Sequence, residues 1–235
     1  MRTWAVILII VLVTIVFAIA VMVHMAVFRD RDVFFLYART WSRLLLRLSG
    51  VRVVVHGQHH LDPAERYIYV TNHASMFDIP VLLAFVPDNV RIMYKRELER
   101  VPIFGWCLRM SPFIGIDRSK SREAADALDE TVRTFATGSS VAIFPEGTRS
   151  LDGSVKAFKR GAFTLAARSQ RTIVPIALIG TASILPARTK RLQPGTVEMR
   201  ILLPQRLPEG AGRADEVAMM QTVHQMIAHE VGNQP

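Results

Sequence analysis

Apolar residues are arranged along the chain in three patterns, and each pattern predicts a different kind of element. The first is an unbroken run, because residues 4–23 are apolar except for Thr14. As a helix that rises about 1.5 Å per residue, the run spans about 30 Å, the thickness of the hydrocarbon layer of a membrane. The apolar character continues to Phe28. We therefore expect a transmembrane or membrane-embedded anchor over residues 1–28.

A cleaved signal peptide is the alternative for this segment, since residues 18–20 (Ala-Ile-Ala) resemble a cleavage site. The apolar run continues past that point, and only the amine and Arg2 precede it, which favours an anchor. Several arginines follow the run closely, namely Arg29, Arg31, Arg39, Arg43 and Arg47. Basic flanks stay on the cytoplasmic side of a membrane. We expect the cytoplasmic membrane as the location, with the remaining chain on its cytoplasmic side.

The second pattern is a basic stripe within residues 31–49. Arg39, Arg43 and Arg47 recur every four residues, which places them on one side of a helix, and aromatic and aliphatic residues cover the rest. Such a helix suits the headgroup boundary of a bilayer, where each arginine adds ~1 kcal/mol beside anionic lipids. We expect an amphipathic interfacial helix here, with an ordinary helix packed on the core as the open alternative.

The third pattern, from residue 50 onward, alternates short apolar runs with helical periods. The runs predict strands at 51–56, 67–71, 90–94, 113–116, 140–144, 173–178 and 196–203. The periods predict helices at 77–85, from Ser119 or Ser121 to Gly138, at 159–169 and at 215–231. Strands separated by helices imply an α/β fold: a mixed, mostly parallel sheet flanked by helices, in one domain over residues 50–235.

Composition narrows the choice of partner. Half of the 235 residues are hydrophobic and 21% are charged, which is typical of a folded chain. The net charge of +9 suits either nucleic acid or an anionic lipid surface. Because no zinc-finger spacing, basic zipper or RNA-binding signature is present, we expect membrane lipids and not nucleic acid as partners. The single cysteine, Cys107, allows no disulfide within the chain, and its apolar neighbours predict a buried side chain.

Polar residues gather where two of the predicted strands end, which is where active sites lie in such sheets. In the first loop, His73 follows a strand and Asp78 opens the next helix. A carboxylate on one ring nitrogen sets the tautomer and orientation that a histidine needs to act as a base. Such a spacing is common, however, and capping of a turn is the alternative. Ser75 lies between the two without a Gly-x-Ser-x-Gly elbow, so it is not assigned as a nucleophile.

The second loop has the character of an anion site. Gly147 permits a turn that other residues resist, and backbone amides beside it can bind a phosphate or a developing oxyanion. Arg149 offers a planar fork for two oxygens, and Lys156, Lys159 and Arg160 follow it. A solvated surface is the alternative for these charges, but their position beside a strand end favours anion binding.

Together the two loops resemble a known family. The motif Asn72-His73-x4-Asp78 and the later motif Phe-Pro-Glu-Gly-Thr-Arg-Ser at 144–150 are similar to those of the glycerolipid acyltransferases, which include the 1-acylglycerol-3-phosphate acyltransferases. The likeness covers roughly residues 50–205. The segment 116–118 (Ile-Asp-Arg) fits a further motif of the family, but Pro112 stands where glycine is usual.

The resemblance implies an O-acyltransferase of phospholipid biosynthesis. His73 would deprotonate the acceptor hydroxyl, Asp78 would hold His73, and the hydroxyl would attack the acyl thioester directly. The substrate-binding residues that the resemblance implies are Lys95, Arg118, Glu146, Gly147, Thr148 and Arg149. Acyl-CoA or acyl-carrier protein would be the donor, with the acyl chain in an apolar tunnel near the anchor, and no metal or bound cofactor would be needed.

The acceptor that the resemblance implies is the free sn-2 hydroxyl of 1-acylglycerol-3-phosphate, and the product is phosphatidic acid. Another lysolipid or glycerol-3-phosphate is the alternative acceptor for the same chemistry. A metal hydrolase built on His56, His59 and His60 is disfavoured because no glutamate stands at a ligand spacing. A membrane-binding or nucleic-acid-binding module without activity would have no need of the His73/Asp78 pair.

Overall fold

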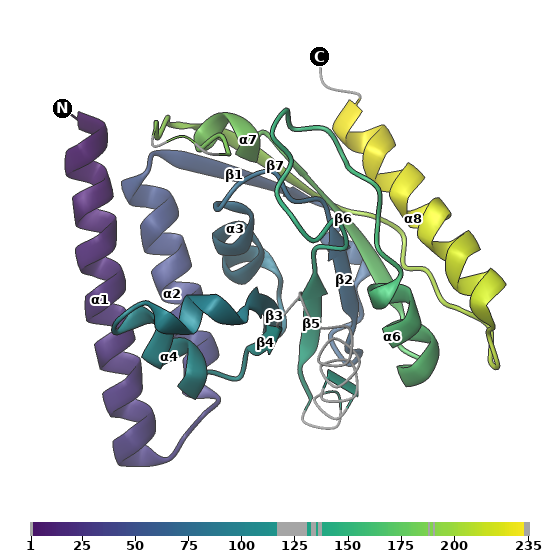
Figure 1. Cartoon of the computed structure of the whole chain (residues 1–235), viewed down its shortest axis with the longest axis horizontal. Coiled ribbons are helices and arrows are strands. Elements are labelled where there is room, and N and C mark those ends of the chain that lie inside the picture. The colour runs from purple at the N-terminus through teal and green to yellow at the C-terminus, as the bar shows by residue number, and fades with distance from the viewer. Residues whose placement is uncertain are drawn as a thin grey trace.

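The structure, a computed structural model, describes residues 2–116, 131–132, 135, 138–187, 189 and 191–232. In this part of the chain, seven strands form one sheet in the order β1-β7-β6-β2-β5-β3-β4 (Figure 1). The strands are β1 (Val51–His56), β2 (Ile68–Thr71), β3 (Val90–Lys95), β4 (Ile114–Ile116), β5 (Ser140–Ile143), β6 (Ile173–Ile179) and β7 (Gly195–Ile201). Each of the runs predicted as a strand is a strand, and its ends lie within two residues of the prediction.

The central strand of the sheet is β2. Its neighbours β6 and β5 run parallel to it, and β3 and β4 continue the parallel set beyond β5. β7 pairs antiparallel with β6, and β1 pairs parallel with β7. The sheet is therefore mixed and mostly parallel, which confirms the predicted fold class. Because parallel strands end at the same edge of a sheet, the loops that follow β2 and β5 meet.

Helices cover both faces of the sheet, which explains why its central strands are apolar throughout. α2 (Val33–Leu48) and α3 (Asp78–Phe85) lie on one face, and α6 (Gly161–Ser169) and α8 (Arg213–Gly232) lie on the other (Figure 1). Successive side chains of β2 alternate between the two cores: Tyr69 belongs to the α2–α3 side, and Ile68 and Val70 belong to the α6–α8 side.

Four short elements were not predicted, because none is long enough to show a helical period. They are the α-helices α4 (Phe104–Met110) and α7 (Thr181–Ile184) and the 3-10 turns η1 (Gln58–His60) and η2 (Arg96–Arg100). The helix predicted from Ser119 or Ser121 to Gly138 lies mostly outside the described residues.

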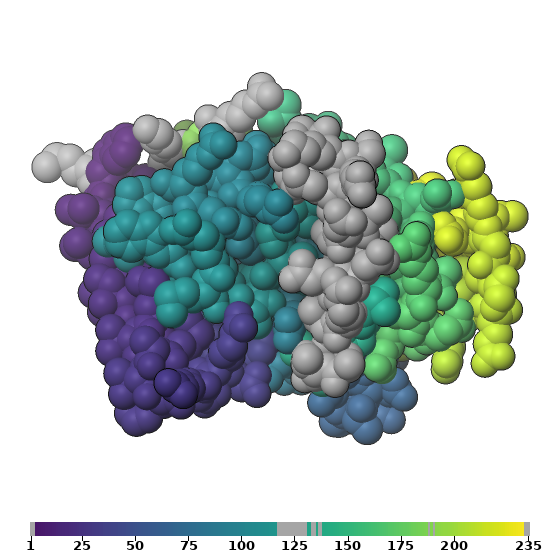
Figure 2. Space-filling model, turned by 60° about the horizontal axis from the view of Figure 1, so that its bottom comes forward, coloured from purple at the N-terminus to yellow at the C-terminus, as the bar shows by residue number. Residues whose placement is uncertain are grey.

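An apolar helix, α1 (Arg2–Phe28), lies against the α/β domain. Among the described residues it is the only helix long and apolar enough to cross a membrane, over Thr3–Phe28. One side of it, with Ala18, Val21 and Met25, packs against α2 and α4, and most of the remaining surface is exposed. Figure 2 shows α1, in purple, directly beside the teal segment that contains α4. The helix has the form of an anchor, and its place in a membrane stays a prediction.

The three arginines of the predicted stripe on α2 have different surroundings. Arg43 and Arg47 are exposed. Arg39 is half-buried, and its Nη2 donates to the carbonyl oxygens of residues 86–88 at 3.4, 3.2 and 2.9 Å. Those carbonyls follow the last turn of α3, so Arg39 caps the negative end of that helix. The prediction of a lipid-facing side chain is therefore wrong for Arg39, and it stays a prediction for Arg43 and Arg47.

Replacing Arg39 should destabilise the fold, whereas replacing Arg43 should not. Arg39→Gln removes a charged donor from three carbonyl groups, and we expect the free energy of unfolding to fall by about 1–2 kcal/mol. Arg43→Gln is the matched control on the same helix, with an expected change within about 0.5 kcal/mol. Denaturant titration of both variants measures the difference, and equal effects would contradict the capping role.

Candidate active site

The loop between β2 and α3 brings His73 and Asp78 together. Nδ1 of His73 lies 2.7 Å from Oδ2 of Asp78. Asp78 is fully buried at the first position of α3, and the same oxygen accepts the backbone N–H groups of Ala74 and Ser75, both at 2.8 Å. The two side chains that the sequence predicts as a pair are thus in direct contact.

This contact determines which ring nitrogen of His73 is free. Because Oδ2 of Asp78 already accepts two backbone N–H groups, the proton between it and the ring belongs to Nδ1. The other nitrogen, Nε2, then carries a lone pair and has no partner in the described part of the chain. The side chain of His73 is 15% exposed, so part of the ring reaches solvent. His73 therefore has the tautomer and orientation of a general base.

Side-chain hydrogen bonds fix the loop around this pair. Nδ2 of Asn72 donates to the carbonyl of Leu178 on β6 at 2.9 Å, and Oδ1 accepts the N–H of the same residue at 2.8 Å. The hydroxyl of Ser75 donates to the carbonyl of Leu185 at 3.0 Å and is buried. Ser75 therefore supports the loop, in agreement with its not being assigned as a nucleophile.

The buried Glu146 joins the loop after β5 to the His73 loop. Its Oε1 accepts the backbone N–H of His73 at 2.7 Å, and its Oε2 accepts that of Lys156 at 3.2 Å. The N–H of Ser150 also donates to the carbonyl of His73 at 2.7 Å. Burial raises the pKa of the Glu146 carboxyl above its usual value, against the effect of these backbone hydrogen bonds. Because both oxygens hold backbone groups, Glu146 positions His73.

Gly147 makes the turn at the centre of the second loop. Its φ of +74° lies in the left-handed region, and a Cβ there would lie 3.1 Å from Nζ of Lys159. The N–H of Gly147 donates to the carbonyl of Phe144 at 3.1 Å, so it is not directed at a ligand. The N–H groups of Thr148 and Arg149 donate to no acceptor among the described residues. Any anion bound by the backbone here would lie on those two groups.

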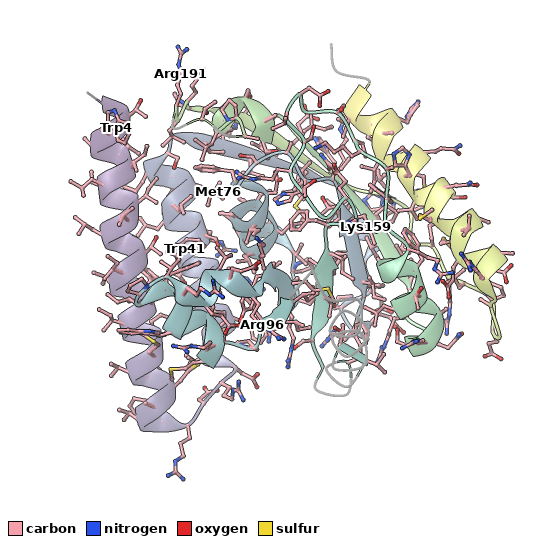
Figure 3. The ribbon with its side chains drawn as sticks, viewed as in Figure 1. Trp4, Trp41, Met76, Arg96, Lys159 and Arg191 are labelled. Carbon is pink, nitrogen blue, oxygen red and sulfur yellow. The ribbon has the colours of Figure 1, made fainter. Side chains whose placement is uncertain are left out.

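Cationic side chains surround the turn. The guanidinium of Arg149 and the ammonium of Lys159 have no hydrogen-bond or ion-pair partner in the described part of the chain. Nζ of Lys156 donates to the carbonyl of Arg149 at 2.9 Å and so supports the turn itself. Figure 3 shows Lys159 on the side of the central strands toward α6, and Met76 of the His73 loop on the side toward α2. Unpaired cations beside amides that have no acceptor are groups of the kind that can bind a phosphate or an oxyanion.

One of the predicted substrate-binding residues, Lys95, is paired away from these loops. Lys95 ends β3 at the same edge of the sheet, but it is exposed and its Nζ pairs with Oε1 of Glu97 at 3.0 Å. Arg118 lies outside the described residues. The histidines considered for a metal, His56, His59 and His60, follow β1. Since β1 runs opposite to β2, they lie at the far edge of the sheet from His73.

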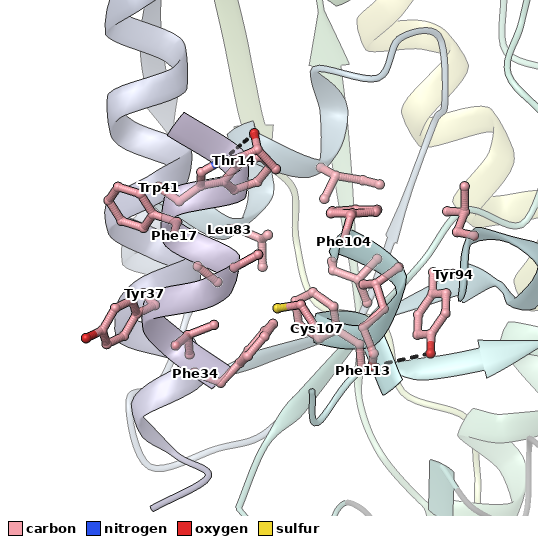
Figure 4. Close-up of a pocket in the computed structure, with 17 residues that line it drawn as sticks. Thr14, Phe17, Phe34, Tyr37, Trp41, Leu83, Tyr94, Phe104, Cys107 and Phe113 are labelled. Carbon is pink, nitrogen blue, oxygen red and sulfur yellow. Dashed lines mark hydrogen bonds between the residues drawn. The ribbon is translucent and has the colours of Figure 1, made fainter. Parts of the chain in front are cut away.

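An apolar cavity of about 130 Å³ lies beside α3 (Figure 4). Side chains from α1, α2, α3 and α4 line it. One of them is Ile79, the residue that follows Asp78 on α3. Cys107 also lines it, and burial raises the pKa of its thiol to about 11. The thiol therefore stays protonated at neutral pH, as expected of a small buried side chain.

Several positioning contacts could not be found from the sequence. The ring of Phe144 stacks on the ring of His73, with centroids 4.2 Å apart and planes inclined by 30°. Asn72, Phe144 and Glu146 all belong to the recognised motifs, but nothing in their spacing indicates that they hold the His73 loop. Only the pairing of β2 with β5 and β6 brings these residues within reach of it.

Comparisons with known proteins agree with this geometry. The chain matches a family model described as acyltransferase over residues 52–179. It is 36% identical over 159 residues to the 1-acyl-sn-glycerol-3-phosphate acyltransferase alpha of Mus musculus, covering 67% of this chain and 56% of that protein. It is 38% identical over 169 residues to the chloroplastic 1-acyl-sn-glycerol-3-phosphate acyltransferase LPAT1 of Arabidopsis thaliana, covering 71% and 47%. The chain thus spans about half the length of these curated relatives.

A solved structure is similar over nearly the whole chain. The crystal structure of the 1-acyl-sn-glycerophosphate (LPA) acyltransferase PlsC from Thermotoga maritima superposes with a TM-score of 0.81 at 25% sequence identity. The superposition covers 98% of this chain and 94% of that one. The match therefore includes α1 and α2 as well as the sheet and its loops.

The tautomer of His73 can be measured directly. We expect nitrogen NMR of the ¹⁵N-histidine-labelled protein at neutral pH to show His73 protonated at Nδ1 and not at Nε2, because Asp78 accepts at Nδ1. In Asp78→Asn the amide oxygen or the amide nitrogen can face the ring, and the preference for the Nδ1–H form should weaken or disappear. A predominant Nε2–H form in the unaltered protein would contradict the assignment.

Proposed function

The chain belongs to the acyltransferase family, and we propose that it transfers a fatty acyl group to the free sn-2 hydroxyl of 1-acylglycerol-3-phosphate, giving phosphatidic acid. The donor is acyl-CoA or acyl-carrier protein. The observation that carries the proposal is the buried His73–Asp78 contact, which leaves Nε2 of His73 free. The acceptor is inferred from the proteins that the chain resembles.

The proposed chemistry needs one base and no covalent enzyme intermediate. Nε2 of His73 takes the proton of the acceptor hydroxyl while the hydroxyl oxygen attacks the carbonyl carbon of the thioester. The carbon–sulfur bond then breaks, and the leaving thiolate receives that proton from the imidazolium. Asp78 stabilises the imidazolium between the two transfers. A base positioned in this way contributes roughly 10²–10⁴-fold in rate.

The second loop supplies the charge that the substrates need. We assign the acceptor phosphate to Arg149 and Lys159, with the N–H groups of Thr148 and Arg149 as further donors. Lys95 and Arg118 are proposed to extend this site. Glu146 and the Gly147 turn act indirectly, because Glu146 holds His73 and the turn presents the two free amides.

The apolar cavity is the proposed place of the acyl chain. It lies between α1, α2, α3 and α4, and Ile79, which lines it, follows Asp78 in the chain. Its lining is almost entirely apolar, and the hydroxyl of Thr14 is occupied by the indole N–H of Trp41 at 3.0 Å (Figure 4). A chain of methylene groups gains ~0.8 kcal/mol for each group removed from water in such a space.

Membrane association follows from α1 and from the similar proteins, and we propose that α1 lies within one leaflet. Val6, Ile10 and Ala18 contact the domain along much of the length of α1, so α1 cannot cross the bilayer alone without carrying α2 and α4 with it. We further propose that the domain lies on the cytoplasmic side of the cytoplasmic membrane, which the arginines that follow α1 support.

An acceptor panel tests the proposed function. The purified full chain is mixed with a labelled acyl donor and with 1-acylglycerol-3-phosphate, other lysolipids or glycerol-3-phosphate, and lipid chromatography reads the products. We expect phosphatidic acid from the first acceptor. If only another acceptor gives a labelled product, the proposed acyl-transfer reaction would stand, but the proposed acceptor would be wrong.

Removal of the base should abolish turnover without loss of the fold. We expect His73→Ala to lower kcat by about 10³-fold or more, since it removes the base, and Asp78→Asn by about 10²–10⁴-fold, since it removes the carboxylate that orients His73 and stabilises the imidazolium. Membrane association and thermal unfolding of His73→Ala should match those of the unaltered chain. Turnover retained by a folded His73→Ala would exclude the proposed mechanism.

Narrowing the cavity should shorten the preferred acyl chain. Ala18 is buried and lines the cavity, so Ala18→Phe fills part of it, and each methylene excluded costs about fourfold in kcat/KM. Ala26→Phe, at an exposed position of the same helix, is the matched control. A series of donors of increasing chain length checks the shift, and an unchanged optimum in Ala18→Phe would place the acyl chain elsewhere.

A further inference from the structure

α4 is apolar on both of its sides. Phe104, Cys107 and Leu108 point into the cavity. On the outer side, Trp106 is 51% exposed and Met110 is 38% exposed. The preceding turn adds two more exposed apolar side chains, Leu98 at 41% and Val101 at 45%. A surface helix of a water-soluble domain normally has a polar outer side, so this arrangement requires an explanation.

The backbone holds these side chains outward in a fixed conformation. Ile103 has φ of +65° and ψ of −61°, and the N–H of Phe104 donates to the carbonyl of Pro102 at 2.7 Å, which is a γ-turn of the rare, strained kind. Gly105 packs directly on η2, where a Cβ would lie 2.3 Å from the carbonyl oxygen of Glu99. A β-branched residue with positive φ persists only where its surroundings enforce it. The outward position of Trp106 is therefore built into the turn.

Basic side chains border the exposed apolar residues. Arg100 and Arg109 are exposed and have no hydrogen-bond or ion-pair partner in the described part of the chain. We refer to Leu98, Val101, Trp106, Met110, Arg100 and Arg109 together as the α4 patch. An aromatic ring with apolar neighbours and unpaired arginines suits the boundary between headgroups and acyl chains.

The α4 patch lies next to α1, because the buried side of α1 packs against α4. Ala18, Val21 and Met25 of α1 share a core cluster with Cys107 of α4. Beyond the end of α1, Nη2 of Arg31 donates to the carbonyl of Met110 at 3.3 Å. Figure 2 shows the two segments, purple and teal, forming one side of the molecule together. Whatever medium covers the exposed side of α1 therefore reaches α4.

We propose that the α4 patch is a second membrane-contact surface, which inserts Trp106 and Met110 into the headgroup boundary of an anionic bilayer beside α1. Arg100 and Arg109 contact lipid phosphates. The proposal rests on the proposed membrane location of α1. A bilayer is favoured over an acidic carrier protein because a protein partner on this patch would have to share its surface with the exposed apolar side of α1.

Tryptophan fluorescence in the full chain tests the proposal. Trp4→Phe with Trp41→Phe leaves Trp106 as the reporter of α4, and Trp41→Phe with Trp106→Phe leaves Trp4 as the reporter of α1. A third variant replaces all three tryptophans by Phe and adds Gln225→Trp on α8 as a control far from α1 (Figure 1). Each is placed in vesicles of phosphatidylcholine and phosphatidylglycerol whose acyl chains are brominated near the headgroup.

We expect bromolipids to quench Trp106 by about half or more, because an interfacial side chain enters the headgroup–acyl boundary. Gln225→Trp should be unaffected. Quenching of Trp4 without Trp106 would overturn the proposal and leave the membrane location of α1 intact, whereas quenching of neither would overturn both. A change in Trp106 emission caused by acyl-carrier protein, with no bromolipid quenching, would identify the patch as a protein-docking site instead.

Charge reversal provides a second measurement that does not depend on the tryptophan ring. In the Trp106 reporter, Arg100→Glu with Arg109→Glu should reduce quenching in anionic vesicles, since each arginine contributes about a fivefold factor in binding beside such a surface. Arg206→Glu with Arg213→Glu changes the net charge equally at two exposed positions, one before α8 and one at its first residue, and should have no effect. Equal effects of both pairs would contradict a local contact at α4.

Discussion

One carboxylate oxygen, Oδ2 of Asp78, holds the reaction centre together. It accepts the ring N–H of His73 and two backbone N–H groups of the same loop, so the loop conformation, the tautomer and the charge beside the ring depend on a single atom. Because Asp78 is fully buried, these hydrogen bonds form where water does not compete and where a missing partner is costly. An uncharged side chain of similar shape would keep part of the loop but would not stabilise an imidazolium.

The strands on both sides of β2 also hold the His73 loop in position. The His73 loop is tied to β6 through Asn72 and to the loop after β5 through Glu146 and Ser150, so both neighbours of β2 help to orient one imidazole. These ties use side chains that look like substrate ligands in the sequence. The groups without a partner in the described part of the chain are Nε2 of His73, two backbone amides and two cationic side chains. Some residues of the site therefore position the loops, and others are available to bind substrate.

The sequence predicts the features that depend on local pattern and fails where tertiary contacts decide. The strands and the His73–Asp78 contact follow from apolar runs and from a five-residue spacing that a short turn can close. The capping role of Arg39 and the positioning role of Glu146 cannot be predicted from the sequence. Each side chain bonds to backbone groups, and the sequence does not show which backbone groups lie within reach. The sequence indicates a turn at Gly147 with backbone amides for an anion, but it does not show which amides are free, and the N–H of Gly147 itself donates to the carbonyl of Phe144. A short element such as α4 has too few residues to show a helical period. It is stabilised by packing against η2 and α1.

The apolar helix α1 has two sides with different proposed functions, so deleting the helix would affect both functions at once. Its outer side is exposed and suited to lipid, while its inner side supplies Ala18 and Val21 to the wall of the apolar cavity. Removing α1 to obtain a soluble domain would therefore uncover Phe34 and Cys107 and open the cavity along its length. Such a truncated chain would lose its proposed acyl-binding wall together with its anchor, so its loss of activity would not distinguish the two. Point substitutions confined to one side of α1 separate them.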